Sequence, residues 1–110
     1  LSKSGFMAYA SSKSALRSLT SSLAVELGDR ASFCLIEPAA VDTDMLSSGF
    51  QKNKDFRKSL MAVHPSGSIG EPVDIAEMVL FLASLKTNFI NGSVFTIDGG
   101  IRGLLPDLHF

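Results

Sequence analysis

The chain has 110 residues, a formal net charge of −1 and 45% hydrophobic residues. This length allows at most one domain, and the apolar content excludes an intrinsically disordered protein. Without a long basic run, the sequence lacks the electrostatic signature of a nucleic-acid-binding or membrane-surface protein. No apolar stretch reaches the roughly 20 residues that span a bilayer. No signal peptide is visible either, so we expect a cytoplasmic protein.

The first predicted element is a helix over residues 8–28, which ends at Gly28 as a natural C-cap. Its apolar face contains Leu16, Leu19, Leu23 and Leu27. Tyr9 and Lys13 are four residues apart and should share one face of this helix. A tyrosine ordinarily ionises near pH 10, and a nearby ammonium favours the phenolate. The pair is a candidate general acid/base, although a stacked surface pair has the same spacing.

A strand over residues 31–37 follows, and its nearly continuous apolar character is typical of a parallel strand covered on both faces. Pro38 ends it, because proline cannot donate a hydrogen bond to the sheet. Cys34 is the single cysteine, and within this apolar run we expect a buried, reduced thiol. Residues 38–43 then form a turn at the carboxyl end of the strand, where ligands bind in open α/β sheets.

Residues 44–70 are irregular and are predicted to form a flap with short helices over 43–50 and 54–62. His64 in this flap is a possible substrate contact, but a histidine beside Pro65 in a loop is more ordinarily just exposed.

A second clear helix is predicted from Glu71 to about Ser84, because Pro72 suits a first helical turn and Asp74 suits its positive end. A strand over residues 92–97 follows and ends at Asp98-Gly99-Gly100. Alternating helices and strands predict an α/β fold with a parallel sheet. Two strands are few for such a sheet, so we expect a partner or a missing beginning.

Four motifs, in the same order along the chain, resemble the C-terminal half of a short-chain dehydrogenase/reductase. Tyr9-Ala10-Ser11-Ser12-Lys13 is similar to the family's Tyr-x-x-x-Lys signature. Residues 38–45 are similar to its Pro-Gly-x-Val-x-Thr turn. Residues 70–84 resemble the helix after the substrate flap, and residues 91–100 resemble the closing strand, which commonly ends Val-Asp-Gly-Gly.

The resemblance implies the C-terminal portion of a doubly wound, Rossmann-like parallel sheet that is incomplete without its N-terminal βαβ units. Within this single domain, residues 1–43 would hold the catalytic helix, a strand and the nicotinamide-side turn. Residues 44–70 would form the substrate flap, residues 71–100 the last helix and strand, and residues 101–110 a tail.

The same resemblance implies an NAD(P)-dependent oxidoreductase that interconverts a carbonyl and an alcohol on a small molecule. Tyr9 would be the catalytic acid/base, and Lys13 would bind the nicotinamide ribose hydroxyls and stabilise the phenolate. The other cofactor contacts implied are Pro38, Ala39, Val41 and Thr43. NAD or NADP would be the cofactor, no metal is expected, and the complete protein would be a homodimer or tetramer.

Two departures from the family pattern bear on activity. Ala39 stands where the family usually has glycine, which costs about 1 kcal/mol if that position needs a positive φ and is otherwise harmless. The family's catalytic serine and Gly-rich dinucleotide loop would both lie ahead of Leu1. We therefore expect the isolated chain to be inactive. A non-catalytic fragment that keeps the association surfaces, or one half of a split enzyme, are the alternatives.

Overall fold

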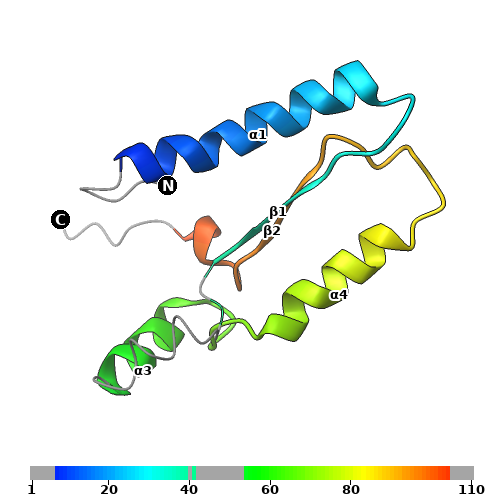
Figure 1. Cartoon of the computed structure of the whole chain (residues 1–110). Coiled ribbons are helices and arrows are strands. Elements are labelled where there is room, and N and C mark those ends of the chain that lie inside the picture. The colour runs from blue at the N-terminus through cyan, green and yellow to red at the C-terminus, as the bar shows by residue number, and fades with distance from the viewer. Residues whose placement is uncertain (1–6, 40, 42–53, 105–110) are drawn as a thin grey trace. The chain divides into compact units, whose positions relative to one another are not determined.

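The computed structural model describes residues 7–39, 41 and 54–104, and it has the helix and strand order expected from the sequence. The elements in Figure 1 are α1 (Met7–Leu27), β1 (Leu35–Pro38), α3 (Lys54–Val63), α4 (Pro72–Ala83), β2 (Val94–Ile97) and the 3-10 helix η1 (Ile101–Gly103). The sequence did not predict η1, and the helix expected over residues 43–50 lies outside the described residues. Of the helices described, none is long and apolar enough to cross a bilayer.

β1 and β2 lie side by side and form a two-stranded sheet. The Leu35 N–H donates to the Ser93 carbonyl at 2.9 Å, and the Ala39 N–H donates to the Ile97 carbonyl at 3.1 Å. Both strands advance by the same four residues in the same direction between these bonds, which is a parallel register. The predicted α/β fold with parallel strands is therefore confirmed.

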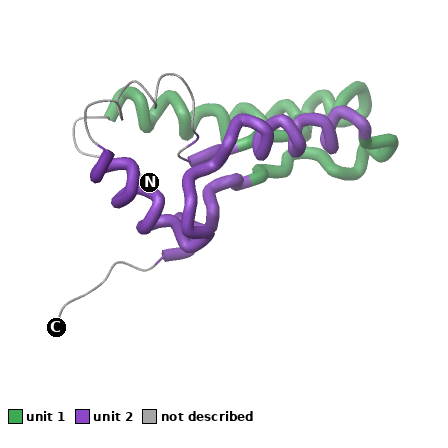
Figure 2. The backbone as a smooth tube through the Cα atoms, turned by 90° about the horizontal axis from the view of Figure 1, so that it is seen from below, with its two compact units in different colours: residues 1–36, 85–95 green, residues 37–84, 96–110 purple. Residues whose placement is uncertain are grey.

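The chain divides into two compact units, which Figure 2 shows in different colours. Unit 1 contains residues 1–36 and 85–95, and unit 2 contains residues 37–84 and 96–110. Each strand passes from unit 1 into unit 2, β1 after Ile36 and β2 after Phe95. The Tyr9–Lys13 pair therefore belongs to unit 1, and the turn after Pro38 belongs to unit 2.

In unit 1, α1 confirms the predicted helix to within one residue at each end. Gly28 follows its last residue, but it does not adopt the positive φ of a left-handed cap. A Cβ at Gly28 would collide with the Ala24 carbonyl oxygen and lie 2.9 Å from Asn91 Nδ2. Glycine is thus needed here for close approach of the chain rather than for an unusual backbone angle.

The Asn91 side chain connects the end of α1 to the start of the strands. Its Oδ1 accepts the Phe33 N–H at 2.7 Å, and its Nδ2 donates to the Ala24 carbonyl at 3.2 Å. The neighbouring Gly92, at φ +73°, donates its N–H to the Phe33 carbonyl at 2.7 Å. Because a side chain takes the Phe33 N–H, β1 begins at Leu35 rather than at residue 31 as predicted.

β1 is also less covered than its apolar sequence predicted. Its first three residues are half-buried and Pro38 is exposed. Cys34, just before the strand, is half-buried as well, with Sγ 3.7 Å from the Ile90 carbonyl oxygen. The expectation of a strand covered on both faces is therefore wrong for the part of the chain that the structure describes.

In unit 2, α4 confirms the predicted second helix. Glu71 is its N-cap, and the Glu71 N–H donates to Asp74 Oδ2 at 2.7 Å, which is half of a capping box. Pro72 occupies the first helical position, where its missing N–H costs nothing. The predicted stop at Ser84 also holds, since the Ser84 N–H donates to the Leu80 carbonyl at 3.0 Å.

α3 confirms the predicted helix over residues 54–62, but the expected exposure of His64 after it is wrong. His64 is only 4% exposed. The turn that follows is held against the end of β2, because the Ser66 N–H donates to the Gly99 carbonyl at 3.0 Å. A Cβ on Gly100 would lie 3.3 Å from the Pro65 ring, so the two turns are in close contact. This contact covers His64 and makes it part of the core of unit 2.

We expect Asn91→Ala to lower the free energy of unfolding by about 1–3 kcal/mol, because it leaves two half-buried backbone groups without their partners. Urea unfolding followed by circular dichroism measures this loss. Asn88→Ala is the matched control, since Asn88 accepts the Ser32 hydroxyl through its backbone carbonyl, which the substitution keeps. Equal stability of Asn91→Ala and Asn88→Ala would contradict the role of the Asn91 amide.

Candidate active site

The first turns of α1 carry the acid/base pair predicted from the sequence. Lys13 Nζ lies 5.4 Å from the centroid of the Tyr9 ring, which is within the range of a cation–π contact. The predicted sharing of one helix face is thereby confirmed. Tyr9 is 61% exposed, so the pair lies at the surface of unit 1. The first turn of α1 contains no acidic residue that would offset the charge of Lys13.

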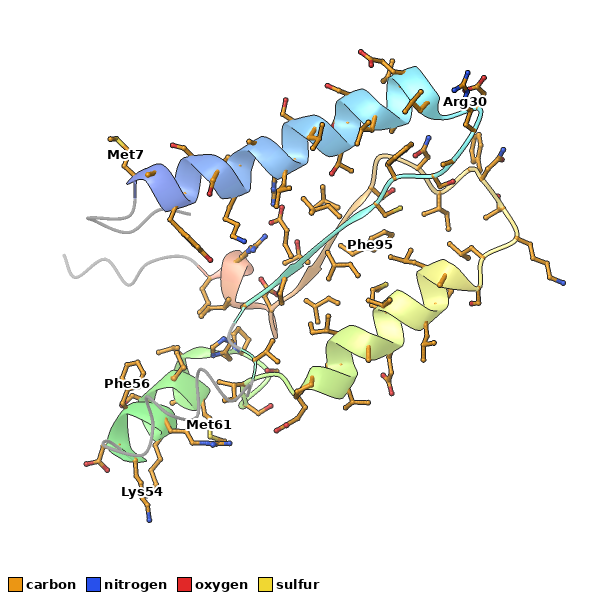
Figure 3. The ribbon with its side chains drawn as sticks, viewed as in Figure 1. Met7, Arg30, Lys54, Phe56, Met61 and Phe95 are labelled. Atoms are coloured by element: carbon orange, nitrogen blue, oxygen red, sulfur yellow. The ribbon has the colours of Figure 1, made fainter. Side chains whose placement is uncertain are left out.

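Two hydroxyl side chains of α1 donate to backbone carbonyls of the preceding turn. The Ser12 hydroxyl donates to the Tyr9 carbonyl at 2.7 Å, and further along the Thr20 hydroxyl donates to the Leu16 carbonyl at 2.7 Å. Figure 3 shows Met7 at the start of the helix and Arg30 in the turn beyond its end. Tyr9 therefore sits on the first turn of a 21-residue helix, which fixes its backbone.

The turn after β1 forms the second group of predicted site residues, and it belongs to unit 2. Pro38 is the last residue of β1, and Ala39 follows with its N–H bound to the Ile97 carbonyl at 3.1 Å. Ala39 does not have a positive φ, so alanine is harmless where the family usually has glycine. Val41 makes an isolated parallel bridge with Gly70. Thr43, the last predicted contact, lies outside the described residues.

Three charged side chains join the carboxyl ends of β1 and β2 in unit 2. Arg102 Nη1 forms an ion pair with Glu37 Oε2, and Arg102 Nε lies 3.9 Å from Asp98 Oδ2. Glu37 directly precedes Pro38. Arg102 was not predicted from the sequence to be part of this region. The one signal available was the opposite charge four residues after Asp98.

Asp98 is the anchor of this group. Its Oδ1 accepts the Gly100 N–H at 2.9 Å and its Oδ2 accepts the Arg102 N–H at 3.0 Å. The Gly100 hydrogen bond, together with the Arg102 N–H and charge, lowers the pKa of Asp98 from its usual 3.8. Gly99 and Gly100 have φ of +62° and +91°, which explains why both are glycine where the strand ends.

The residues fit one part of a dinucleotide. A phenol and an ammonium on one helix face supply the donors that ribose hydroxyls require, and both belong to the exposed start of α1. The turn at the carboxyl end of β1 lies where α/β sheets bind ligands. Taken by itself, the Tyr9–Lys13 pair of unit 1 suits the ribose of a nicotinamide nucleotide, and the sequence contains no glycine-rich loop of the kind that holds dinucleotide phosphates.

Comparison with known proteins agrees with this geometry. A family model described as enoyl-(acyl carrier protein) reductase matches residues 2–102. A crystal structure of a short chain dehydrogenase family protein from Francisella tularensis superposes with a TM-score of 0.84 at 32% identity. The chain belongs to the short-chain dehydrogenase/reductase family. As a family member, it shares the Rossmann-like α/β fold of these proteins.

Two further proteins resemble the chain, one in sequence and one in structure. The 3alpha-hydroxysteroid dehydrogenase of Mediterraneibacter gnavus is 39% identical over 95 residues, which is 86% of this chain and 37% of that protein. The structure of ElxO with NADP bound has a TM-score of 0.78 at 32% identity and covers 87% of this chain. The chain spans 39% of ElxO and 47% of the Francisella protein, so it corresponds to less than half of each relative.

We expect the Asp98 carboxyl to titrate below 3.8, with the amide signals of Gly100 and Arg102 following the same transition. Because the pKa of Asp98 is lower in the folded than in the unfolded chain, its ionised carboxyl stabilises the fold above pH 3.8. This stabilisation is lost as the pH falls from 3.8 through the pKa of the folded chain. An NMR titration measures the midpoint. A midpoint at or above 3.8 would show that the two backbone hydrogen bonds are not formed in solution.

Proposed function

We propose that the chain is the acid/base-bearing part of an NAD(P)-dependent oxidoreductase that interconverts a carbonyl and an alcohol. The observation that carries the proposal is the placement of Lys13 Nζ 5.4 Å from the Tyr9 ring centroid on the first turns of α1. Membership of a family whose structures include NADP-bound ElxO supports the choice of cofactor. NAD and NADP remain equal candidates for this chain.

Tyr9 is the proton donor and acceptor in this proposal. In reduction its hydroxyl gives a proton to the carbonyl oxygen of the substrate, and in oxidation its phenolate takes the proton of the alcohol. Lys13, whose Nζ lies 5.4 Å from the Tyr9 ring centroid, would donate from its ammonium to the ribose hydroxyls. The bound NAD(P) supplies or accepts the hydride.

The turn after β1 would hold the nicotinamide. Pro38, Ala39, Val41 and Thr43 are the proposed contacts. The Ala39 N–H is already bound to Ile97, so the backbone of Val41 is the better candidate for the carboxamide. Thr43 would add a hydroxyl for the carboxamide or the pyrophosphate. Within the same proposal, residues 44–70 are the substrate flap and residues 71–100 complete the domain.

Activity is proposed to require a further N-terminal portion. The chain spans 37% of the Mediterraneibacter dehydrogenase, and the remainder of such a protein would supply the serine and the phosphate-binding loop. A homodimer or tetramer is proposed for the complete protein, acting on a small carbonyl or alcohol.

A non-catalytic role through association is the second candidate. The observation in its favour is the number of large apolar side chains exposed on one helix of unit 2. On α4, Val79 is 49% exposed, Leu80 is 69% exposed and Phe81 is 52% exposed. Removal of the Tyr9 hydroxyl separates the two candidate functions. It should abolish turnover in an oxidoreductase, whereas association through α4 does not depend on this hydroxyl.

We expect Tyr9→Phe to lower turnover by about 10²–10⁴-fold and to leave cofactor affinity nearly unchanged. The assay uses a chimera in which this chain follows the N-terminal part of the Mediterraneibacter dehydrogenase, with a 3α-hydroxysteroid as substrate. Phenylalanine keeps the aromatic ring that Lys13 contacts and removes only the hydroxyl that would transfer the proton. Absorbance of the reduced cofactor measures turnover, and its fluorescence measures binding.

Ser12→Ala is the matched control, since it removes a hydroxyl one turn away that contacts the Tyr9 backbone. It should leave turnover unchanged. Retained turnover in Tyr9→Phe would refute the acid/base assignment, and equal loss in both variants would assign the effect to the helix rather than to the phenol.

A further inference from the structure

We propose that Arg102 is a positioning residue that fixes the turn after β1 and offsets part of the negative charge of Glu37 beside the nicotinamide. The proposal rests on the proposed function, because it takes Pro38, Ala39 and Val41 as cofactor contacts. The proposal is based on two ion pairs of Arg102, one with Asp98 and one with Glu37, and all three residues belong to unit 2.

Several contacts within unit 2 hold the turn after β1, among them the parallel bridge between Val41 and Gly70. Pro38 has no N–H and cannot donate to β2. The next backbone bond to β2 is the one from Ala39 to Ile97, at 3.1 Å. Glu37, one residue before Pro38, adds a side-chain support through its ion pair with Arg102. Loss of this ion pair would therefore remove one of the supports of the turn, next to the bond from Ala39 to Ile97.

The guanidinium of Arg102 is itself held in place. The Arg102 N–H donates to Asp98 Oδ2 at 3.0 Å, and Nε lies 3.9 Å from the same oxygen. The side chains of Asp98, Glu37 and Arg102 are 9%, 17% and 32% exposed. Charges that are partly shielded from water interact more strongly than exposed ones. Asp98 thus anchors Arg102, and Arg102 anchors Glu37.

The charges have a consequence for the redox state of the cofactor. The nicotinamide ring is positive when oxidised and neutral when reduced. A Glu37 carboxylate without its Arg102 partner would favour the positive ring. By pairing with Glu37, Arg102 keeps the affinities for the two cofactor forms closer together. A residue that only stabilised the fold would weaken binding of both forms equally.

The test measures binding of the oxidised and reduced cofactors to the chimera carrying Arg102→Gln, Arg102→Lys or Glu37→Gln. We expect Arg102→Gln to weaken binding of the reduced cofactor about five- to tenfold, as for loss of one ordinary hydrogen bond. The ratio of oxidised to reduced Kd should fall about threefold or more. Arg102→Lys keeps the positive charge and should largely retain both the affinity for the reduced cofactor and the ratio of the two Kd values. Glu37→Gln should leave this ratio at or above that of the unmodified chimera.

Arg30→Gln is the matched control, because Arg30 is an exposed arginine in the turn after α1, in unit 1. It should change neither affinity. A ratio that stays constant in Arg102→Gln, or one that moves as much in Arg30→Gln, would overturn the proposal.

Hydrogen exchange of the Ala39 amide gives a readout that needs no cofactor. Arg102→Gln and Glu37→Gln should each speed this exchange, whereas Arg30→Gln should not. Unchanged exchange in both variants would overturn the positioning role, whatever binds to the turn. Faster exchange in a protein whose unmodified form binds neither NAD(H) nor NADP(H) would support the positioning role while refuting the proposed function.

Discussion

The parallel pairing of β1 with β2 is the constraint on which the rest of the structure depends. It joins segments of the chain that are 58 residues apart, through backbone bonds from Leu35 to Ser93 and from Ala39 to Ile97. Because the strands are parallel, their carboxyl ends meet at one edge. The turn beginning at Pro38 and the turn beginning at Asp98 therefore become neighbours within unit 2, and Arg102 can pair with Glu37.

Local sequence signals were sufficient for the helices. The leucine spacing of α1 and the Glu71-Pro72 start of α4 act within one or two turns, so the sequence predicted both helices closely. The Tyr9–Lys13 contact was predictable for the same reason, since neighbours four residues apart on a helix depend on no other part of the fold.

Contacts between segments that are distant in the chain could not be predicted from the sequence. The burial of His64 and the ion pair of Glu37 with Arg102 each depend on a partner far along the chain, as does the approach of Asn91 to Gly28. Nothing in the local pattern around His64 indicates that the turn after β2 covers it. The domain segments and the role of Thr43 rest on family resemblance and remain predictions.

The central claim is that this chain carries the proton-transfer residues of a nicotinamide-dependent enzyme and needs an N-terminal portion to bind the cofactor. The most direct measurement is a titration of NADH and NADPH into the isolated chain, without and with the N-terminal part of the Mediterraneibacter dehydrogenase. We predict saturable binding of at least one cofactor to the combined protein and none to the isolated chain. Tight binding to the isolated chain, or no binding in either case, would contradict the account.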